Sequence, residues 1–323
     1  MKILVTGKDG QLGKAFQKEF DHFFEKTSSD VVVHYIGRQE CDLADLSALE
    51  KMLQDFEPNV IINAAAFTAV DKAEQEIDLA FVINAVVPGL LARYAVTHGA
   101  TLLHYSTDYV FNGAGSDFYS EDRPVSPLGV YGKSKAEGEE LIINAFSKSA
   151  NTNARYAIFR TSWVYGEGRN FIRTILRLAK ERSELKVIAD QFGVPTSAQW
   201  LANLSGFFLL DLSQAGNVSI RKFHSGIYHA VPSGETTWYG LAYEVVRYAT
   251  ELGKNLAIGP NEIKPIPAIQ YPLPAPRPMN SRLSTAKLAA ELERLGLMSK
   301  LTDSSNALNQ PWDENVRAYI KAQ

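Results

Sequence analysis

The stretch from Lys2 to Gly13, KILVTGKDGQLG, decides the fold that we predict for this chain. Its first half is a run of apolar, mostly branched side chains typical of a buried strand, and a helical pattern follows from Lys14 to Phe24. Glycines at positions 7, 10 and 13 permit a tight turn, close approach of the backbone to a pyrophosphate, and close packing of helix on strand. The helix N-terminus adds free N–H groups and a positive dipole end. The stretch therefore predicts a dinucleotide site; the alternative is a glycine-rich turn without a ligand.

Short apolar runs alternate with segments of helical length through the first half of the chain. This alternation predicts right-handed βαβ crossovers and a parallel sheet covered by helices on both faces. Ligands of such a sheet bind at the carboxyl ends of its strands. We therefore predict an α/β fold with a doubly wound parallel sheet of the Rossmann type. The expected strands are Ile3–Thr6, Val31–Ile36, Val60–Asn63, Thr101–Tyr105 and Tyr156–Phe159.

After residue 160 the alternation ends. A loop at Gly166–Asn170 leads into an amphipathic stretch, Phe171–Arg182, where we expect a second region to begin. Gly226–Val231 is typical of one more core strand, which indicates that the chain returns to the first sheet. Six prolines from Pro265 to Pro278 predict an ordered loop over the smaller lobe. The two predicted units are a dinucleotide-binding domain, residues 1–162 and about 195–232, and a smaller α/β substrate lobe, about 163–194 and 233–323.

The composition excludes several classes of protein. The 323 residues include 33 basic and 36 acidic side chains, so no excess positive charge favours nucleic acid as a partner. Apolar runs such as Val60–Ala66 are far shorter than the roughly 20 residues of a membrane-spanning helix, so we expect no membrane contact. The chain starts with a strand and a turn rather than an apolar secretory segment, and we expect a cytoplasmic protein.

The spacing of potential metal ligands predicts no metal site. The single cysteine, Cys41, can form neither an internal disulfide nor a cysteine-based metal site, and we expect it to be structural and unreactive. The six histidines are scattered, without the paired spacing typical of zinc enzymes.

The end of the second expected strand bears on the choice of cofactor. A carboxylate there would accept hydrogen bonds from the adenosine ribose, whereas an arginine would pair with a 2′-phosphate. The sequence has Tyr35, Ile36, Gly37 and Arg38 at this place, and therefore no carboxylate at the strand end. We favour NADPH, with NADH possible; the alternative is that Arg38 is a solvated surface residue.

Tyr131 and Lys135 begin a second pattern, at the start of a helix that we expect to run to about Phe146. A spacing of four residues places both side chains on one helix face. An adjacent ammonium and a cationic nicotinamide favour the phenolate, and we expect them to move the tyrosine pKa toward the working range. The pair could then protonate a ketone as hydride arrives, although an ordinary helix pair has the same spacing.

Thr107 lies in the third pattern, His104–Phe111, which follows the fourth expected strand. Polar residues at the carboxyl end of a strand face the ligand crevice. We therefore expect Thr107 to hydrogen-bond a substrate carbonyl oxygen; the alternative is a hydroxyl that caps a turn.

These three patterns together resemble the extended short-chain dehydrogenase/reductase family. Within it the chain is similar to the branch that reduces nucleotide-linked 4-keto-6-deoxysugars. The similarity covers nearly the whole chain, which makes it far more specific than the glycine motif alone. It is carried by Asn63–Glu74, Tyr105–Phe111, Tyr131–Lys135, Phe159–Tyr165, Gly193–Thr196 and Arg277–Leu283.

The resemblance implies NADPH-dependent reduction of the C4 ketone of dTDP-4-dehydro-β-L-rhamnose to dTDP-L-rhamnose, the last step of dTDP-rhamnose biosynthesis. Sugar-nucleotide 4,6-dehydratases of the same superfamily carry a glutamate after the Thr-Asp pair, whereas this chain has Tyr109, which favours simple ketone reduction. Two alternatives stay open. One is a reductase of another nucleotide-linked 4-keto-6-deoxysugar, and the other is a non-catalytic, cofactor-binding regulatory subunit resembling the methionine adenosyltransferase β subunit.

The resemblance also implies roles for individual residues. Tyr131 would donate the proton, Lys135 would tune it and hold the nicotinamide ribose, and Thr107 would orient the C4 carbonyl. Asn84 could anchor a water relay behind Lys135 or be an ordinary amide on a helix face. The implied cofactor site is Gly7, Gly10, Gln11, Leu12, Gly13, Arg38, Asp42, Leu43, Ala66, Phe67, Thr68, Tyr131 and Lys135, and the substrate site is Val70, Thr107, Asp108 and Trp163, the last with a packed core indole as the alternative.

Assembly is the point on which the chain departs from some relatives, which join subunits through carboxylates bridged by Mg²⁺. Two matching positions here are Ala15 and Gln199, so only Asp313 remains acidic. Because such a bridge needs hard oxygen ligands, we predict no metal and a monomer or a metal-independent homodimer.

Overall fold

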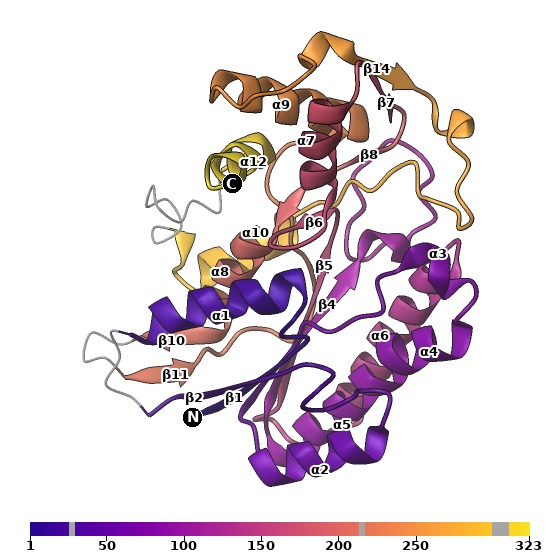
Figure 1. Ribbon diagram of the computed structural model, residues 1–323. Helices are drawn as coiled ribbons and strands as arrows, with labels where there is room; N and C mark the ends of the chain where they lie inside the picture. Colours follow the sequence, from indigo (N-terminus) through magenta and orange to yellow (C-terminus); the bar gives the residue numbers. More distant parts are fainter. Residues whose placement is uncertain (26–29, 213–216, 299–309) are drawn as a thin grey trace.

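The computed structural model describes residues 1–25, 30–212, 217–298 and 310–323 (Figure 1). The two predicted units also include 26–29, 213–216 and 299–309, which lie outside the described residues.

A parallel sheet of six strands lies at the centre of the fold. Its strands are β1 (Lys2–Thr6), β2 (Val32–Ile36), β3 (Val60–Asn63), β4 (Thr101–Thr107), β5 (Arg155–Thr161) and β12 (Gly226–His229). They are arranged in the order β12-β5-β4-β3-β1-β2, and each neighbouring pair is parallel. The strand order reverses beside β1, which is where a doubly wound sheet binds its ligand. The predicted fold class and the return of the chain through β12 are confirmed.

Helices cover both faces of this sheet because successive strand residues point to opposite sides. Ile3 and Val5 pack with helices on one face, whereas Leu4 packs with helices on the other. The first layer contains α1 (Gln11–Phe24) and α8 (Ala198–Leu209), and the second contains α2 (Leu46–Phe56), α5 (Val87–His98) and α6 (Val130–Ser147) (Figure 1). The first and last residues of α6 lie close to the predicted ones. α1 begins at Gln11 rather than Lys14, because Gly10 in an extended conformation is its N-cap.

One apolar segment contradicts our expectation that no run is long enough to cross a membrane. A 22-residue helix of mean hydropathy 1.7 is long and apolar enough to cross a membrane, judged by length and composition alone. It consists of α4 (Ile77–Phe81), the π-helical turn η1 (Val82–Val86) and α5. We missed it because Asp78, Asn84 and Arg93 interrupt the run. In the fold 61% of its apolar window is buried, and buried side chains of α5 such as Leu91 join the core beneath α6. A buried core helix accounts for this composition.

A second core lies beside the sheet. It is built from α7 (Phe171–Glu181), α9 (Trp238–Glu251), α12 (Trp312–Lys321) and the parallel strands β7 (Leu185–Ile188) and β14 (Ile263–Ile266). The amphipathic stretch predicted after Asn170 is therefore a helix. α10 (Ala286–Arg294) instead places Leu288 and Leu292 in the core next to the sheet. The division of the chain into two units stays a prediction, with α10 packed on the side of the first unit.

The proline-rich segment starts within β14 rather than in a loop. Pro265 is tolerated there because β14 belongs to a two-stranded sheet and is an edge strand.

The remaining short elements are α3 (Val70–Ala73), η2 (Asp108–Val110), η3 (Pro260–Glu262), η4 (Ala268–Gln270) and the strand pairs β6 (Val164–Tyr165) with β9 (Thr196–Ser197), β8 (Phe192–Gly193) with β13 (Thr236–Thr237), and β10 (Leu210–Leu212) with β11 (Val218–Ile220).

Candidate active site

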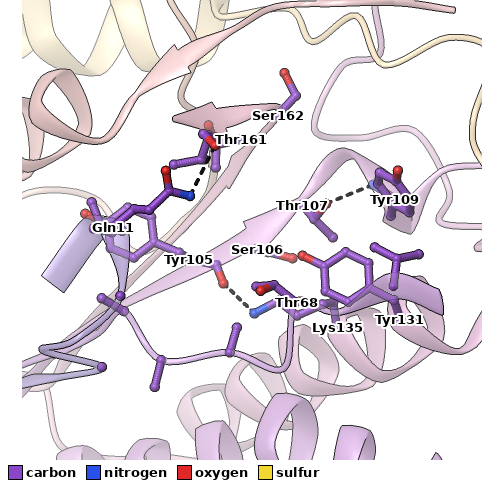
Figure 2. A pocket seen from close by; sticks show the side chains of 18 of the residues that line it. Gln11, Thr68, Tyr105, Ser106, Thr107, Tyr109, Tyr131, Lys135, Thr161 and Ser162 are labelled. Carbon is purple, nitrogen blue, oxygen red and sulfur yellow. Dashed lines mark hydrogen bonds between the residues drawn. The ribbon is translucent and has the colours of Figure 1, made fainter. Parts of the chain in front are cut away.

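A cavity of about 560 Å³ opens at the carboxyl ends of β1, β4 and β5. It brings together the turn after β1, the end of β4 and the start of α6, which are the three patterns that the sequence analysis selected (Figure 2). A smaller cavity of about 150 Å³ adjoins it and shares Gly7, Arg38 and Ala66. The predicted residues Gly7, Gly10, Gln11, Leu12, Arg38, Ala66, Thr68, Val70, Thr107, Asp108, Tyr131, Lys135 and Trp163 line the larger cavity, and Asp42, Leu43 and Phe67 line the smaller one.

The glycine turn has the shape of a cradle for a phosphate group. Gly7 has φ +73°, and a Cβ there would lie 2.8 Å from the backbone of Ala65. A Cβ on Gly13 would lie 2.1 Å from the carbonyl oxygen of Gly7, so Gly13 serves the packing of the turn and lines neither cavity. Gln11, in the first turn of α1, has a buried Oε1 without a hydrogen-bond partner among the described residues. The free N–H groups at the start of α1 fit a pyrophosphate, whereas the Gln11 Oε1 is an acceptor and suits a donor group of a ligand.

The turn after β2 carries charges of both signs. Arg38 is exposed, lines both cavities, and has no ion-pair partner within the described part of the chain. The carboxylate of Glu40 accepts hydrogen bonds from the Lys8 ammonium and the Gly37 N–H, and these bonds lower its pKa. Asp9 also lies here, since a Cβ on Gly37 would be 2.2 Å from its Oδ2. Our prediction considered only the strand itself and missed Asp9, which comes from the turn after β1.

Thr107 and Tyr131 form the part of the site where a proton could be transferred. Figure 2 shows the phenol of Tyr131 pointing toward the end of β4, where Thr107 lies, and both side chains line the larger cavity. Thr107 Oγ1 donates to Asp108 Oδ1 at 3.0 Å and accepts from the Tyr109 N–H at 3.2 Å. Burial raises the pKa of Asp108 to about 6.

The chain's own groups do not move the pKa of Tyr131 toward the working range. Burial raises it to about 12, and the nearby polar side chain of Thr107 offsets only part of this effect. Desolvation disfavours the phenolate more strongly than any nearby positive charge favours it, because Lys135 is itself desolvated and its pKa is lowered to about 7. Tyr131 is therefore a protonated phenol in this state and can act as a proton donor.

The side-chain nitrogen of Lys135 is hydrogen-bonded to residues of β4 rather than to water. Its Nζ donates to the Tyr105 carbonyl oxygen at 2.5 Å and lies 3.0 Å from His104 Nε2. The opposite ring nitrogen of His104 lies 3.0 Å from the Asn63 Nδ2, and Asn63 Oδ1 accepts a 2.8 Å hydrogen bond from Thr6 Oγ1. This buried chain of polar groups runs from the lysine to the residue that precedes the glycine turn.

Asn84 is tied to a loop and to α6. Its amide accepts from the Phe67 N–H at 2.9 Å and donates to the Phe67 carbonyl oxygen at 3.1 Å and to Ser134 Oγ at 3.0 Å. The side chain is fully buried in η1. Asn84 thus fixes the loop that lines both cavities, and its part in a water relay stays a prediction.

Two stacked indoles form one wall of the larger cavity. Trp163 and Trp238 have ring centroids 3.7 Å apart and planes inclined by 15°. Trp163 has φ +47°, a left-handed backbone conformation that costs free energy for a non-glycine residue. A Cβ on Gly193 would lie 2.6 Å from the Trp163 ring, so the glycine makes room for the indole. Trp163 is partly buried against the second core and also lines the cavity. The predicted substrate contact and the alternative of a packed core indole therefore each describe part of its environment.

Several residues of the site escaped the sequence analysis. Ser281 lies within a stretch that we quoted for the resemblance and His104 begins the third pattern, yet no spacing rule gives either of them a role. Trp238 is distant in sequence from its stacking partner, so no local pattern identifies it.

Cys41 is buried, and burial raises the pKa of its thiol. The described residues contain no group of three or more His, Cys, Asp and Glu side chains that could hold a metal ion. Asp313 accepts a hydrogen bond from the Tyr248 hydroxyl at 3.3 Å.

The parallel sheet, the glycine turn and the Tyr131–Lys135 pair beside Thr107 define a member of the extended short-chain dehydrogenase/reductase class. The family model of the RmlD substrate binding domain matches residues 1–303. The dTDP-4-dehydrorhamnose reductase of Escherichia coli (strain K12) is 42% identical over 89% of this chain and 90% of its own length, and that of Burkholderia thailandensis is 39% identical over 92% and 94%. The crystal structure of the Bacillus anthracis dTDP-4-dehydrorhamnose reductase in complex with NADP has a TM-score of 0.79 at 29% identity and covers 100% and 99% of the two chains. This chain belongs to the dTDP-4-dehydrorhamnose reductase family.

Proposed function

We propose that this protein reduces the C4 ketone of dTDP-4-dehydro-β-L-rhamnose to the alcohol of dTDP-L-rhamnose with NADPH. The observation that carries the proposal is that Tyr131, Thr107 and Lys135, which lies one helical turn from Tyr131, line a single cavity. Curated relatives with this activity are about 40% identical over most of the chain, which supports the choice of substrate.

The cofactor side of the cavity fits NADPH. The glycine turn and Gln11 would hold the pyrophosphate, Arg38 the 2′-phosphate, and the smaller cavity with Asp42 and Leu43 the adenine. When bound, the nicotinamide supplies a hydride for the C4 carbon. Asp9 lies near the place where a ribose would accept or donate hydrogen bonds, so use of NADH at lower efficiency is part of the proposal.

The chain itself supplies the proton for the C4 oxygen. Tyr131 donates its hydroxyl proton as negative charge develops on that oxygen, so the phenol becomes a phenolate. Lys135 stands behind it, where an ammonium would stabilise the phenolate. Thr107 positions the reacting groups, because its hydroxyl is fixed by Asp108 and the Tyr109 N–H.

The substrate would lie between this centre and the second core. Val70, Trp163 and Trp238 line the cavity and offer apolar surface to a 6-deoxysugar. A further cavity of about 360 Å³ shares Tyr109 and Trp238 with the first and includes Lys186 and Arg277. We assign the nucleoside diphosphate to this space, since two cations and an apolar wall suit a charged diphosphate joined to a base.

The assembly and location of the protein are parts of the same proposal. We propose a cytoplasmic protein without nucleic acid or membrane partners, monomeric or dimeric without a metal bridge. Light scattering with and without EDTA tests the last point, and a dimer that EDTA dissociates would refute it.

The activity is tested by following NADPH oxidation after addition of dTDP-4-dehydro-β-L-rhamnose, with the product identified by NMR. A panel of other nucleotide-linked 4-keto-6-deoxysugars in the same assay ranks the alternative substrates. Absence of turnover with every member of the panel, together with tight binding to another protein, would favour the regulatory subunit instead.

A further inference from the structure

The loop that carries the Arg277–Leu283 motif reaches the reactive centre through Ser281. Ser281 Oγ donates a hydrogen bond to Asp108 Oδ2, while Asp108 Oδ1 accepts from Thr107. The exposed fractions of Ser281, Asp108 and Thr107 are 2%, 2% and 5%, so water does not compete for these bonds. Thr107 and Tyr131 line the same cavity, so this hydrogen-bonded chain connects Ser281 with a residue of the wall that also holds the phenol that donates the proton.

The loop holds Ser281 firmly in this place. The Ser281 N–H donates to the Phe192 carbonyl oxygen at 2.8 Å, and the Phe192 N–H donates to the Met279 carbonyl oxygen at 2.9 Å. Asn280 is bonded to the loop after η2, with its N–H 3.0 Å from the Gly113 carbonyl oxygen. The serine hydroxyl therefore approaches Asp108 from a backbone that two other segments of the chain fix.

The number of protons that these hydrogen-bonded side chains carry determines whether the Thr107 hydroxyl donates or accepts. A hydroxyl has one proton, and that of Thr107 is donated to Asp108. Thr107 Oγ1 already accepts from the Tyr109 N–H, which leaves it one acceptor position for a further donor. Thr107 therefore has no second proton to donate, so a phenol that approaches Oγ1 must be the donor. This assignment holds only while Asp108 keeps the orientation and the ionised form that accept the threonine proton.

We propose that Ser281 is a positioning residue for the proposed ketone reduction: by holding the Asp108 carboxylate it fixes the Thr107 hydroxyl, which in turn aims the Tyr131 phenol. The inference rests on the proposed function. Without the serine hydroxyl, Asp108 Oδ2 loses its donor in a buried place, and the carboxyl group becomes free to rotate or to take up a proton. Thr107 then has no fixed direction, and the phenol is aimed less well at the substrate oxygen.

The test compares Ser281→Ala with Ser281→Thr in the full-length enzyme. We expect Ser281→Ala to lower kcat about 10- to 100-fold, because misplacement of a reacting group has effects of this size. The KM for NADPH stays within about twofold, since the glycine turn and Arg38 are distant from the change. Ser281→Thr keeps the hydroxyl and recovers most of kcat.

A matched control separates positioning from simple loss of a buried hydroxyl. Ser205 is fully buried in α8 and its Oγ donates to the Leu201 carbonyl oxygen at 2.7 Å. Ser205→Ala should lower the Tm by a similar amount with kcat nearly unchanged. An unchanged kcat in Ser281→Ala, or an equal loss in both alanine variants, would overturn the proposal.

A measurement that needs no substrate separates the proposal for Ser281 from the proposed reductase activity. The serine bond lowers the pKa of Asp108, so Ser281→Ala should raise it, as measured by ¹³C NMR of carboxyl-labelled aspartate with Asp108→Asn to assign the signal. Tyr109 and Tyr131 are titratable groups that interact with this carboxyl, and both stay protonated over the range examined. If the wild-type protein reduces no ketosugar nucleotide, the proposed function fails. An Asp108 pKa that does not change in Ser281→Ala refutes the role of the serine.

Discussion

The Nζ atom of Lys135 lies 3.0 Å from Nε2 of His104, and both side chains are buried beneath the cavity. Burial and the nearby lysine hold the pKa of His104 well below its usual value, so the ring is neutral. The Asn63 amide nitrogen faces its Nδ1, which must therefore accept, and the ring proton is on Nε2. A proton at that position favours the neutral amine of Lys135, in agreement with the lowered pKa of about 7.

Replacing Lys135 with Met should change how stability depends on pH. Lys135 has a pKa of about 7 in the fold and an ordinary pKa of 10.5, so between these values the unfolded chain binds a proton that the folded chain does not. The stability of the wild type therefore rises with pH in this window, by at most about 1.4 kcal/mol per pH unit. The free energy of unfolding of Lys135→Met should exceed that of the wild type most near pH 7, and the difference should shrink toward pH 10. Urea unfolding at several pH values measures this; parallel curves would refute it.

Removing Glu139 should destabilise the protein strongly. Its carboxylate accepts hydrogen bonds from Arg160 at 2.9 and 2.6 Å, and the exposed fractions of the two side chains are 4% and 2%. Glu139→Ala leaves a buried guanidinium without its partner, which costs about 3 to 5 kcal/mol. Glu181→Ala breaks the exposed pair with Arg177 and should change stability by less than about 1 kcal/mol. Chemical unfolding of both variants makes the comparison, and similar losses in the two would contradict it.

Replacing Arg38 should weaken the binding of NADPH and leave the binding of NADH nearly unchanged. A charge-assisted hydrogen bond to a phosphate contributes about 1.5 to 3 kcal/mol, so Arg38→Ala should raise the KM for NADPH roughly 10- to 100-fold. The KM for NADH should stay nearly unchanged, because NADH has no 2′-phosphate. Steady-state kinetics with each cofactor tests the assignment; an equal effect on both would show that Arg38 does not contact this group.

The sequence predicted the sheet well because its strands are short, branched and regularly separated by helices. It also identified the glycine turn, Thr107, Tyr131 and Lys135, since each follows a strand or opens a helix. It could not show the environment of these groups. The raised pKa of Tyr131 comes from burial, and burial depends on how separate segments pack.

The contact of Ser281 with Asp108 joins residues 173 positions apart, and Asp9 reaches the end of β2 from another turn. Such contacts arise from tertiary packing, which leaves no period in the sequence. The long apolar helix was missed for the opposite reason: polar side chains interrupt a run whose burial only the fold reveals.

The most direct test of the proposed reaction is the rate of NADPH oxidation by Tyr131→Phe with dTDP-4-dehydro-β-L-rhamnose. The phenylalanine keeps the ring that packs against Tyr109, with centroids 5.4 Å apart, and removes only the hydroxyl that donates the proton. General acid catalysis contributes about 10²- to 10⁴-fold, so kcat should fall by that factor while the Kd for NADPH, measured by fluorescence, stays within about twofold. A variant that reduces the ketone at the wild-type rate would show that Tyr131 is not the proton donor.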